Sequence, residues 1–252
     1  MPGATFLDIH TDLCGKRTGT NGRHPLPDPH RLSAALGAAC ISNSTQVVAY
    51  DDCGGTHAAR LWWLLRWLGH NAVAVLDGGW SRWVAEGRPL AVSTTLRAAA
   101  EFKAEPHASM LVDTAFITAN LDSKAALLID ARAPSRFRGE SEPHHGVAGH
   151  ISGALNRPLS RNLNQDGLFQ PPQLLRAEFE HLLAGRLPRD VVHYCGSGVS
   201  ACHNLLAMEI AGLCHSRLYP GSWSEWIDDP SRPVECGDVQ LSGSSTDQGE
   251  TL

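Results

Sequence analysis

Short apolar runs alternate with longer stretches of helical periodicity along most of the chain. Val191–Tyr194 and Leu127–Asp130 are short apolar runs that lead into loops, which is typical of buried strands in a parallel sheet. The stretch Val199–Ala211 instead has apolar residues three and four positions apart, which predicts a helix soon after the first of these strands. Strands that alternate with helices in this way indicate an α/β fold, with a parallel sheet flanked by helices.

The same pattern occurs twice in the chain. The segment QVVAYDDCGGTHAARLWWLLRWLG, from Gln46, corresponds to DVVHYCGSGVSACHNLLAMEIAG, from Asp190. Each has a β-branched run that ends in tyrosine, then a glycine-containing turn and an apolar helical stretch. A second short strand follows each copy, in AVAVLDGGWSRW and in SRLYPGSWSEW. We therefore predict two similar units, in which Asp51 of the first stands where Cys195 stands in the second.

Changes in composition divide the chain into two domains. We place the first, non-catalytic domain at residues 1–98, a polar linker at 99–112 and the second, catalytic domain at 113–236. Residues 237–252 are rich in Ser, Gly and acidic side chains, and we expect this tail to be disordered. The second unit has a strand and a polar loop before its SGA segment at Ser152, and the first unit has no counterpart of them. We therefore expect the first domain to be truncated at its start.

Composition and charge exclude several classes of protein. The net charge of −5 leaves no basic surplus for binding nucleic acid. No apolar run is long enough for a transmembrane helix, and the first residues lack a signal-peptide pattern. The 7 cysteines are odd in number, and the chain is large enough to fold without disulfides, which favours a reduced, cytoplasmic protein; no CxxC pair occurs. The histidines lack metal-ligand spacing, so we expect no metal site. The net charge and the lack of a long apolar run lead us to expect no nucleic-acid partner and no membrane.

One loop has the features of a nucleophilic site. Cys195 directly follows the predicted strand, and its loop contains two glycines, which allow backbone amides to point inward as an anion-binding nest. The helix N-terminus adds partial positive charge, and such surroundings favour the nucleophilic thiolate. A cysteine phosphatase would need an arginine six positions after the cysteine, where this chain has Ala201. We predict a catalytic Cys195 cradled by Gly196, Ser197, Gly198, Val199 and Ser200.

Several motifs together resemble the tandem-domain rhodanese family of sulfurtransferases. They are CGSGVSAC from Cys195, YPGSWSEW from Tyr219, DARAPSRFRGE from Asp130, GHISGALN from Gly149, and RLWWLLRWLGHNAVAVLDGGW from Arg60. The resemblance implies two rhodanese-like domains, each a parallel sheet flanked by helices, of which only the second carries the catalytic cysteine. Relatives also have residues before the point that Pro2 matches, so the resemblance again implies an incomplete first domain.

The resemblance implies a two-step sulfur transfer that needs no cofactor. The Cys195 thiolate would take sulfur from a small-molecule donor as a persulfide and pass it to a thiol, either a small thiol or a thioredoxin-like protein, or to cyanide. The neutral CGSG loop is similar to that of members that use 3-mercaptopyruvate, since thiosulfate-type members carry Arg and Lys there. Thiosulfate remains the alternative donor. A different class of function is a degenerate, non-catalytic rhodanese module that binds partners.

Four further residues are expected to bind the donor. Arg136 matches the family's arginine for the substrate carboxylate, and Arg138 lies two residues further along the same loop. His24 matches the histidine of the family's His-x-Leu-Pro segment, where we expect it to relay protons at the cleft between the domains. His144 stands where mercaptopyruvate-type relatives have a second arginine. His10 is not one of these four residues; it marks a departure from the family, because it replaces an acid of the family's first domain.

Overall fold

The computed structural model describes residues 1–92 and 98–238. The predicted disordered tail therefore lies outside the described residues from position 239 onward. No described helix is long and apolar enough to cross a membrane.

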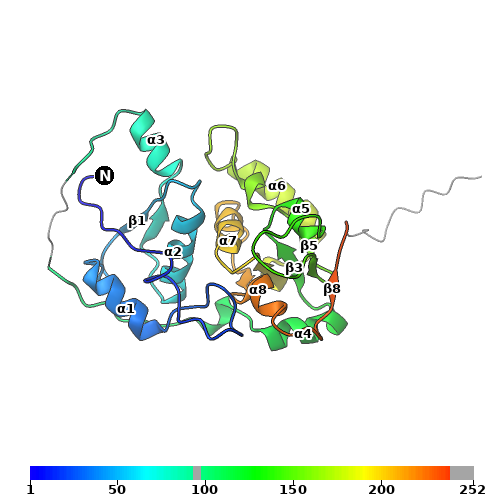
Figure 1. Cartoon of the computed structure of the whole chain (residues 1–252). Coiled ribbons are helices and arrows are strands. Elements are labelled where there is room, and N and C mark those ends of the chain that lie inside the picture. Colours follow the sequence, from blue (N-terminus) through cyan, green and yellow to red (C-terminus); the bar gives the residue numbers. More distant parts are fainter. Residues whose placement is uncertain (93–97, 239–252) are drawn as a thin grey trace, which may run out of the picture.

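A four-stranded parallel sheet forms the centre of the second half of the chain (Figure 1). The strands predicted at Leu127–Asp130 and Val191–Tyr194 are both present with the predicted bounds, as β3 and β6, and they are neighbours in the sheet. All four residues of β6 are buried, which explains its continuous apolar pattern. The order is β5-β3-β6-β7, with β5 at Leu155–Asn156 and β7 at Arg217–Leu218.

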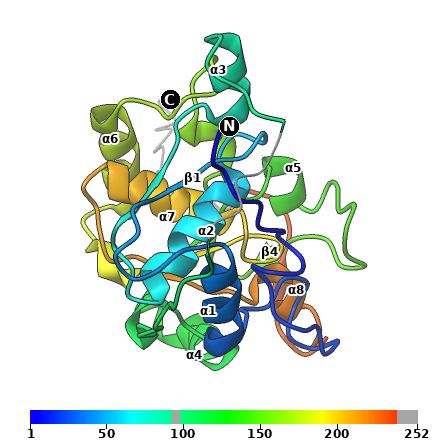
Figure 2. The same cartoon turned by 90° about the vertical axis from the view of Figure 1, so that its left-hand side faces the viewer.

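Helices cover both faces of this sheet (Figures 1 and 2). The predicted helix Val199–Ala211 is confirmed as α7 (Ala201–Ile210), which begins two residues later because Val199 and Ser200 still belong to the preceding turn. Strands β4 and β8 form a separate short antiparallel pair. The other elements of this half are α4 (Thr114–Ser123), α5 (Pro134–Phe137), β4 (His150–Ile151), η2 (Leu159–Asn162), α6 (Pro172–Leu183), η3 (Pro188–Asp190), α8 (Ser222–Trp226) and β8 (Val234–Glu235).

The first half repeats the strand–loop–helix–strand unit. Its two strands pair in parallel, with Val47 opposite Val73, and the first leads through a glycine-containing turn into a helix. The sequence β1-α2-β2-α3 therefore corresponds to β6-α7-β7-α8, which confirms the predicted internal repeat. The elements of this half are α1 (Pro29–Ala38), β1 (Val47–Ala49), α2 (Thr56–Trp67), β2 (Val73–Val75) and α3 (Gly79–Ala85).

Helices α2 and α7 pack against each other and join the two halves (Figure 1). One apolar core runs through this contact and includes Trp62 and Trp63 from α2 together with Cys202 and Leu205 from α7. The contact is the structural basis of the site described below, because each helix begins at a loop that follows a parallel strand.

The predicted linker lies along the first half rather than free of it. Ala100 N–H donates to Gly37 O at 2.9 Å, His107 N–H donates to Trp67 O at 2.8 Å, and Phe102 is buried. The 3-10 helix η1 (Ala108–Met110) then leads into the second half. The domain boundaries themselves stay a prediction.

Candidate functional site

Cys195 lies at the carboxyl end of β6, where the chain turns into α7. The residue is 1% exposed, and its Sγ accepts a hydrogen bond from the backbone N–H of Gly198 at 3.2 Å. Gly198 has a φ of +78°, and a Cβ there would collide with the carbonyl oxygen of Pro220. Glycine is therefore required for the loop to close around the sulfur with this N–H directed inward.

Further amides of the loop have no acceptor in the described part of the chain. Among the residues that the structure describes, the backbone N–H groups of Ser197, Val199 and Ser200 donate no hydrogen bond. They lie just before α7, whose N-terminal dipole adds partial positive charge. Orphan amides of this kind, next to a cysteine sulfur, form a nest that can bind an anion.

The turn into α8 supports the loop from behind. Trp223 N–H donates to Cys195 O at 3.0 Å, and Ser224 N–H donates to Gly196 O at 2.9 Å. The hydroxyl of Ser222 accepts a hydrogen bond from Cys195 N–H at 3.2 Å. These contacts fix the backbone of the loop. They do not involve the N–H groups of Ser197, Val199 and Ser200, which stay available to an anion.

The equivalent loop of the first half holds a carboxylate. Trp80 N–H donates to Asp51 O at 2.8 Å, which reproduces the contact between Trp223 and Cys195 and confirms that the two positions correspond. The Asp51 carboxylate accepts four backbone hydrogen bonds, from the N–H groups of residues 53, 55, 57 and 58 at 2.8–3.0 Å. Burial opposes the charge, but the backbone hydrogen bonds of residues 58, 55 and 53 outweigh it and lower the pKa of Asp51. A loop of this geometry therefore stabilises an anion within this chain.

The structure brings His24 to the loop from the first half. His24 Nδ1 lies 2.7 Å from the hydroxyl of Ser197, within hydrogen-bond distance. Burial, together with the positive charges of Arg23 and His10, lowers the pKa of His24 to about 4. The imidazole is therefore neutral near pH 7, and the ring can orient the Ser197 hydroxyl without adding charge.

Arg136 also lies at the loop. A Cβ on Gly196 would be 3.2 Å from Arg136 Nη2, which places the guanidinium against the residue that follows Cys195. Glu142 holds it there, with Oε1 at 2.8 Å from Nη2. The third nitrogen, Nη1, has no partner within the described part of the chain and remains available to an anion.

The other two predicted donor-binding residues do not reach the loop. Arg138 pairs with Glu140 at 2.6 Å. His144 is exposed, and its backbone N–H donates to Glu142 Oε1 at 3.1 Å. Among the described residues, neither side chain forms a hydrogen bond or an ion pair with the cysteine loop.

Two arginines that the sequence reasoning missed do reach the site. Arg23 lies beside His24 in the lining of one cavity, and its backbone N–H donates to Ser224 Oγ at 2.9 Å, where Ser224 supports the cysteine loop. Burial and, after it, the positive charge of Arg136 lower the pKa of Arg23. Its Nε is buried without a hydrogen-bond partner in the described chain. Arg60, from α2, donates to Gly198 O at 3.1 Å. The available signals were that Arg23 directly precedes the singled-out His24, and that Arg60 interrupts an apolar helical stretch.

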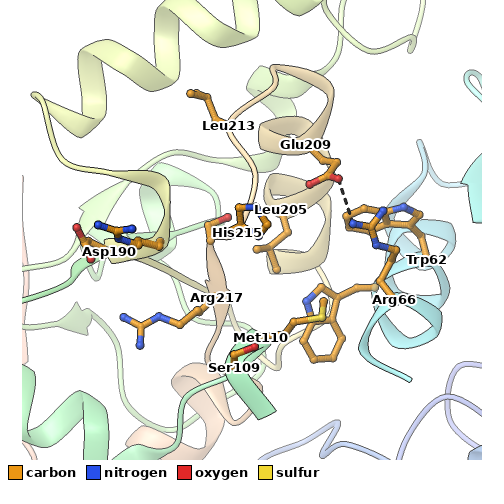
Figure 3. A pocket seen from close by; sticks show the side chains of 13 residues that line it. Trp62, Arg66, Ser109, Met110, Asp190, Leu205, Glu209, Leu213, His215 and Arg217 are labelled. Carbon is orange, nitrogen blue, oxygen red and sulfur yellow. Dashed lines mark hydrogen bonds and ion pairs between the residues drawn. The ribbon is translucent and has the colours of Figure 1, made fainter. Parts of the chain in front are cut away.

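Two cavities, each of about 420 Å³, are candidates for the substrate site. The first is lined by His10, Cys14, Gly15, Arg17, Arg23 and His24, all from the first half, and His24 connects it to Ser197 of the cysteine loop. Figure 3 shows the second, where Arg66 of α2 pairs with Glu209 of α7 at 3.2 Å. Because none of the predicted site residues lines the second cavity, we take the first as the candidate substrate site.

The family model of the rhodanese-like domain matches residues 2–86 and 114–229, once in each half. The chain is 50% identical over 240 residues to the probable 3-mercaptopyruvate sulfurtransferase of Pseudomonas aeruginosa, which covers 94% of this chain and 84% of that protein. It is 38% identical over 230 residues to the human 3-mercaptopyruvate sulfurtransferase, covering 90% and 76% respectively. The bovine thiosulfate sulfurtransferase is 36% identical over 232 residues, covering 90% and 77%.

Solved structures share the fold across both halves. The Tum1 protein of Saccharomyces cerevisiae superimposes with a TM-score of 0.78 at 25% identity, covering 94% of this chain and 84% of Tum1. An EanB variant in complex with ergothioneine gives a TM-score of 0.80 at 25% identity and covers 95% of this chain. The chain spans 61% of the length of that EanB protein.

Proposed function

This chain belongs to the rhodanese family and is a sulfurtransferase, and we propose that it moves a sulfane sulfur from 3-mercaptopyruvate to a thiol or to cyanide through a persulfide on Cys195. The Cys195 thiolate attacks the donor sulfur, the carbon–sulfur bond breaks, and pyruvate leaves as its enolate and takes up a proton. An acceptor thiolate or cyanide then attacks the outer sulfur and releases Cys195 as a thiolate, so no outside oxidant or reductant is needed.

The observation that carries this proposal is the nest of free amides around the sulfur. Gly198 N–H already donates to Sγ, and three further amides of the loop have no acceptor within the described residues. A persulfide extends the cysteine by one anionic sulfur, and amides that are fixed in advance stabilise such a charge without reorganisation. The Asp51 carboxylate, held by four amides in the first half, supports this assignment.

Two guanidinium groups favour a carboxylate donor. We assign Arg136 and Arg23 to the carboxylate of 3-mercaptopyruvate, with Arg23 in the role expected of His144. Arg136 lies against Gly196, Arg23 lines the cavity beside His24, and both have nitrogen atoms without a partner among the described residues. A guanidinium is always charged and matches a carboxylate in shape, which an exposed histidine does not. Thiosulfate is the alternative donor. We include it in the experiment below because the bovine relative is named a thiosulfate sulfurtransferase.

His24 and Ser197 complete the proposed site. The neutral His24 ring and the Ser197 hydroxyl are 2.7 Å apart. Directed by the ring, the hydroxyl donates toward the donor carbonyl or the departing enolate, where negative charge develops.

We propose the cytoplasm as the compartment of this protein. All seven cysteines, Cys195 among them, are free thiols, as in a protein that is kept reduced.

The test is the intact mass of the purified protein after incubation with 3-mercaptopyruvate or with thiosulfate, each without an acceptor. We expect a gain of about 32 Da, one sulfur atom, that is faster with 3-mercaptopyruvate and is removed by cyanide or a thiol. Cys195→Ser should gain nothing, and Cys53→Ser, the exposed cysteine beside Asp51, serves as the matched control that still gains sulfur. If folded protein gains no sulfur from either donor, it is a non-catalytic module.

A further inference from the structure

The buried arginine of helix α2 connects the first half of the molecule to the cysteine loop. Arg60 is 0% exposed, and its Nη1 donates to Gly198 O at 3.1 Å. Its Nη2 lies 3.4 Å from the carbonyl oxygen of His24. One side chain thus holds both the loop around Cys195 and the segment that brings His24 to Ser197.

The donors to the Gly198 carbonyl oxygen favour one direction of the loop; besides Arg60, Cys202 Sγ lies 3.4 Å from this oxygen. Gly198 presents its N–H to the Cys195 sulfur and its carbonyl oxygen to Arg60. A carbonyl oxygen turned toward an anionic sulfur would repel it, whereas the guanidinium binds that oxygen on the far side. Arg60 therefore favours the loop conformation in which donors, and not acceptors, surround the sulfur.

The charge of Arg60 also lacks a counterion. No carboxylate lies within 4.0 Å of it in the described chain. Its titratable neighbours include the thiols of Cys14 and Cys202 and the ring of His24, which is neutral near pH 7. Burial raises the pKa of Cys14 and raises that of Cys202 to about 12, so both stay neutral near pH 7. A buried cation without a counterion is costly, and a thiolate at Cys195 can offset part of that cost, because its Sγ is bound by Gly198 N–H, the residue whose carbonyl oxygen Arg60 holds.

We propose that Arg60 is a positioning residue by which the first half of the molecule holds the cysteine loop open to anions and balances the charge of the Cys195 thiolate and persulfide. The proposal rests on the proposed function. It extends that function to the first half, whose own loop is occupied by the Asp51 carboxylate: this half supplies a buried cation and does not only form a wall of the cleft.

The experiment compares Arg60→Met with Arg66→Met. Both arginines lie on α2 and both contact the second half, Arg60 at Gly198 and Arg66 at Glu209 (Figure 3), so the pair separates an effect on Cys195 from a general loss of interdomain contact. The readout is the rate at which iodoacetamide alkylates Cys195, measured by peptide mass at about pH 7 and about pH 9, because only the thiolate reacts. Thermal melting checks that each variant is folded.

We expect the ratio of the two rates, pH 9 over pH 7, to rise by about twofold or more in Arg60→Met and to stay near the wild-type value in Arg66→Met. A merely structural role would change both rates together and leave the ratio unaltered. A wild-type ratio in folded Arg60→Met overturns the proposal. Alkylation needs no sulfur donor, so this result is independent of whether the protein proves to be a sulfurtransferase for 3-mercaptopyruvate.

Arg60→Lys covers the case in which the methionine variant does not fold. It keeps the charge but cannot reach both carbonyl oxygens, so we expect a near wild-type alkylation ratio together with a roughly tenfold loss in persulfide transfer to a thiol. Full transfer activity in Arg60→Lys would show that the two contacts do not position the loop, and would overturn the proposal.

Discussion

At the scale of single residues, the direction of a side chain decides whether an arginine belongs to the site. Arg136 rests against Gly196, whereas Arg138, two positions along the chain, pairs with Glu140. Residues two apart on a helical turn face different sides, so only one of this pair can line the cleft. We propose that the second guanidinium of the site comes instead from Arg23 of the first half, which lines the cavity beside His24.

Three alanine variants test this assignment. Arg23→Ala and Arg136→Ala should each raise KM for 3-mercaptopyruvate by roughly 10- to 100-fold, because each removes a charged hydrogen bond of about 1.5–3 kcal/mol to the donor carboxylate. Arg138→Ala is the matched control and should change KM by less than about twofold, since it loses only a surface ion pair. Steady-state kinetics measure all three. An effect of Arg138 as large as that of Arg23 would contradict the assignment.

At the scale of elements, the strand–loop–helix unit was predictable and its side-chain partners were not. β3 and β6 were found at their predicted bounds because both are buried in a parallel sheet, and a continuous apolar run is the mark of that setting. The start of α7 was misplaced by two residues because Val199 and Ser200 are used by the turn. Arg60 could not be assigned from the sequence, since its partner Gly198 is 138 positions away.

The loop of this unit makes a sharp prediction about Gly198. Gly198→Ala forces an alanine into φ +78° and drives its Cβ into the Pro220 carbonyl, which should cost about 2–5 kcal/mol and abolish persulfide formation. Gly153→Ala is the control, because Gly153 has φ +76° but nothing within 4 Å of its would-be Cβ. It should cost only about 1–2 kcal/mol and leave persulfide formation intact. Urea unfolding and intact mass separate the two effects; equal losses in both variants would mean that positive φ alone explains them.

At the scale of the whole molecule, the site exists because two halves of similar design meet through α2 and α7. His203 of α7 contributes to this contact: its Nε2 lies 2.9 Å from Gly54 O, in the loop that corresponds to the cysteine loop. The two cradles are therefore linked across the interface, the first filled by Asp51 and the second available to substrate. The sequence reveals the repeat, but it cannot reveal this meeting of loops, which depends on packing between distant segments.

The same histidine makes the assembly sensitive to acid. Burial lowers the pKa of His203 to about 4 and that of His193, within β6, to about 3. In the unfolded chain both titrate near 6.5, so between about pH 6.5 and pH 4 the unfolded state binds more protons than the folded state. Stability is then complete above pH 6.5 and falls as the pH is lowered through this window, by about 1–2 kcal/mol for each histidine at pH 5.

His203→Gln isolates one of these groups. The glutamine amide can still donate to Gly54 O but does not titrate, so the loss of unfolding free energy between about pH 7 and about pH 5 should shrink by about 1–2 kcal/mol relative to the wild type. His30→Gln, at an exposed histidine of α1, should leave that loss unchanged. Urea unfolding at both pH values measures the difference. If His203→Gln remains as acid-sensitive as the wild type, protonation elsewhere separates the two halves, and His203 is not the group through which acid acts on their contact.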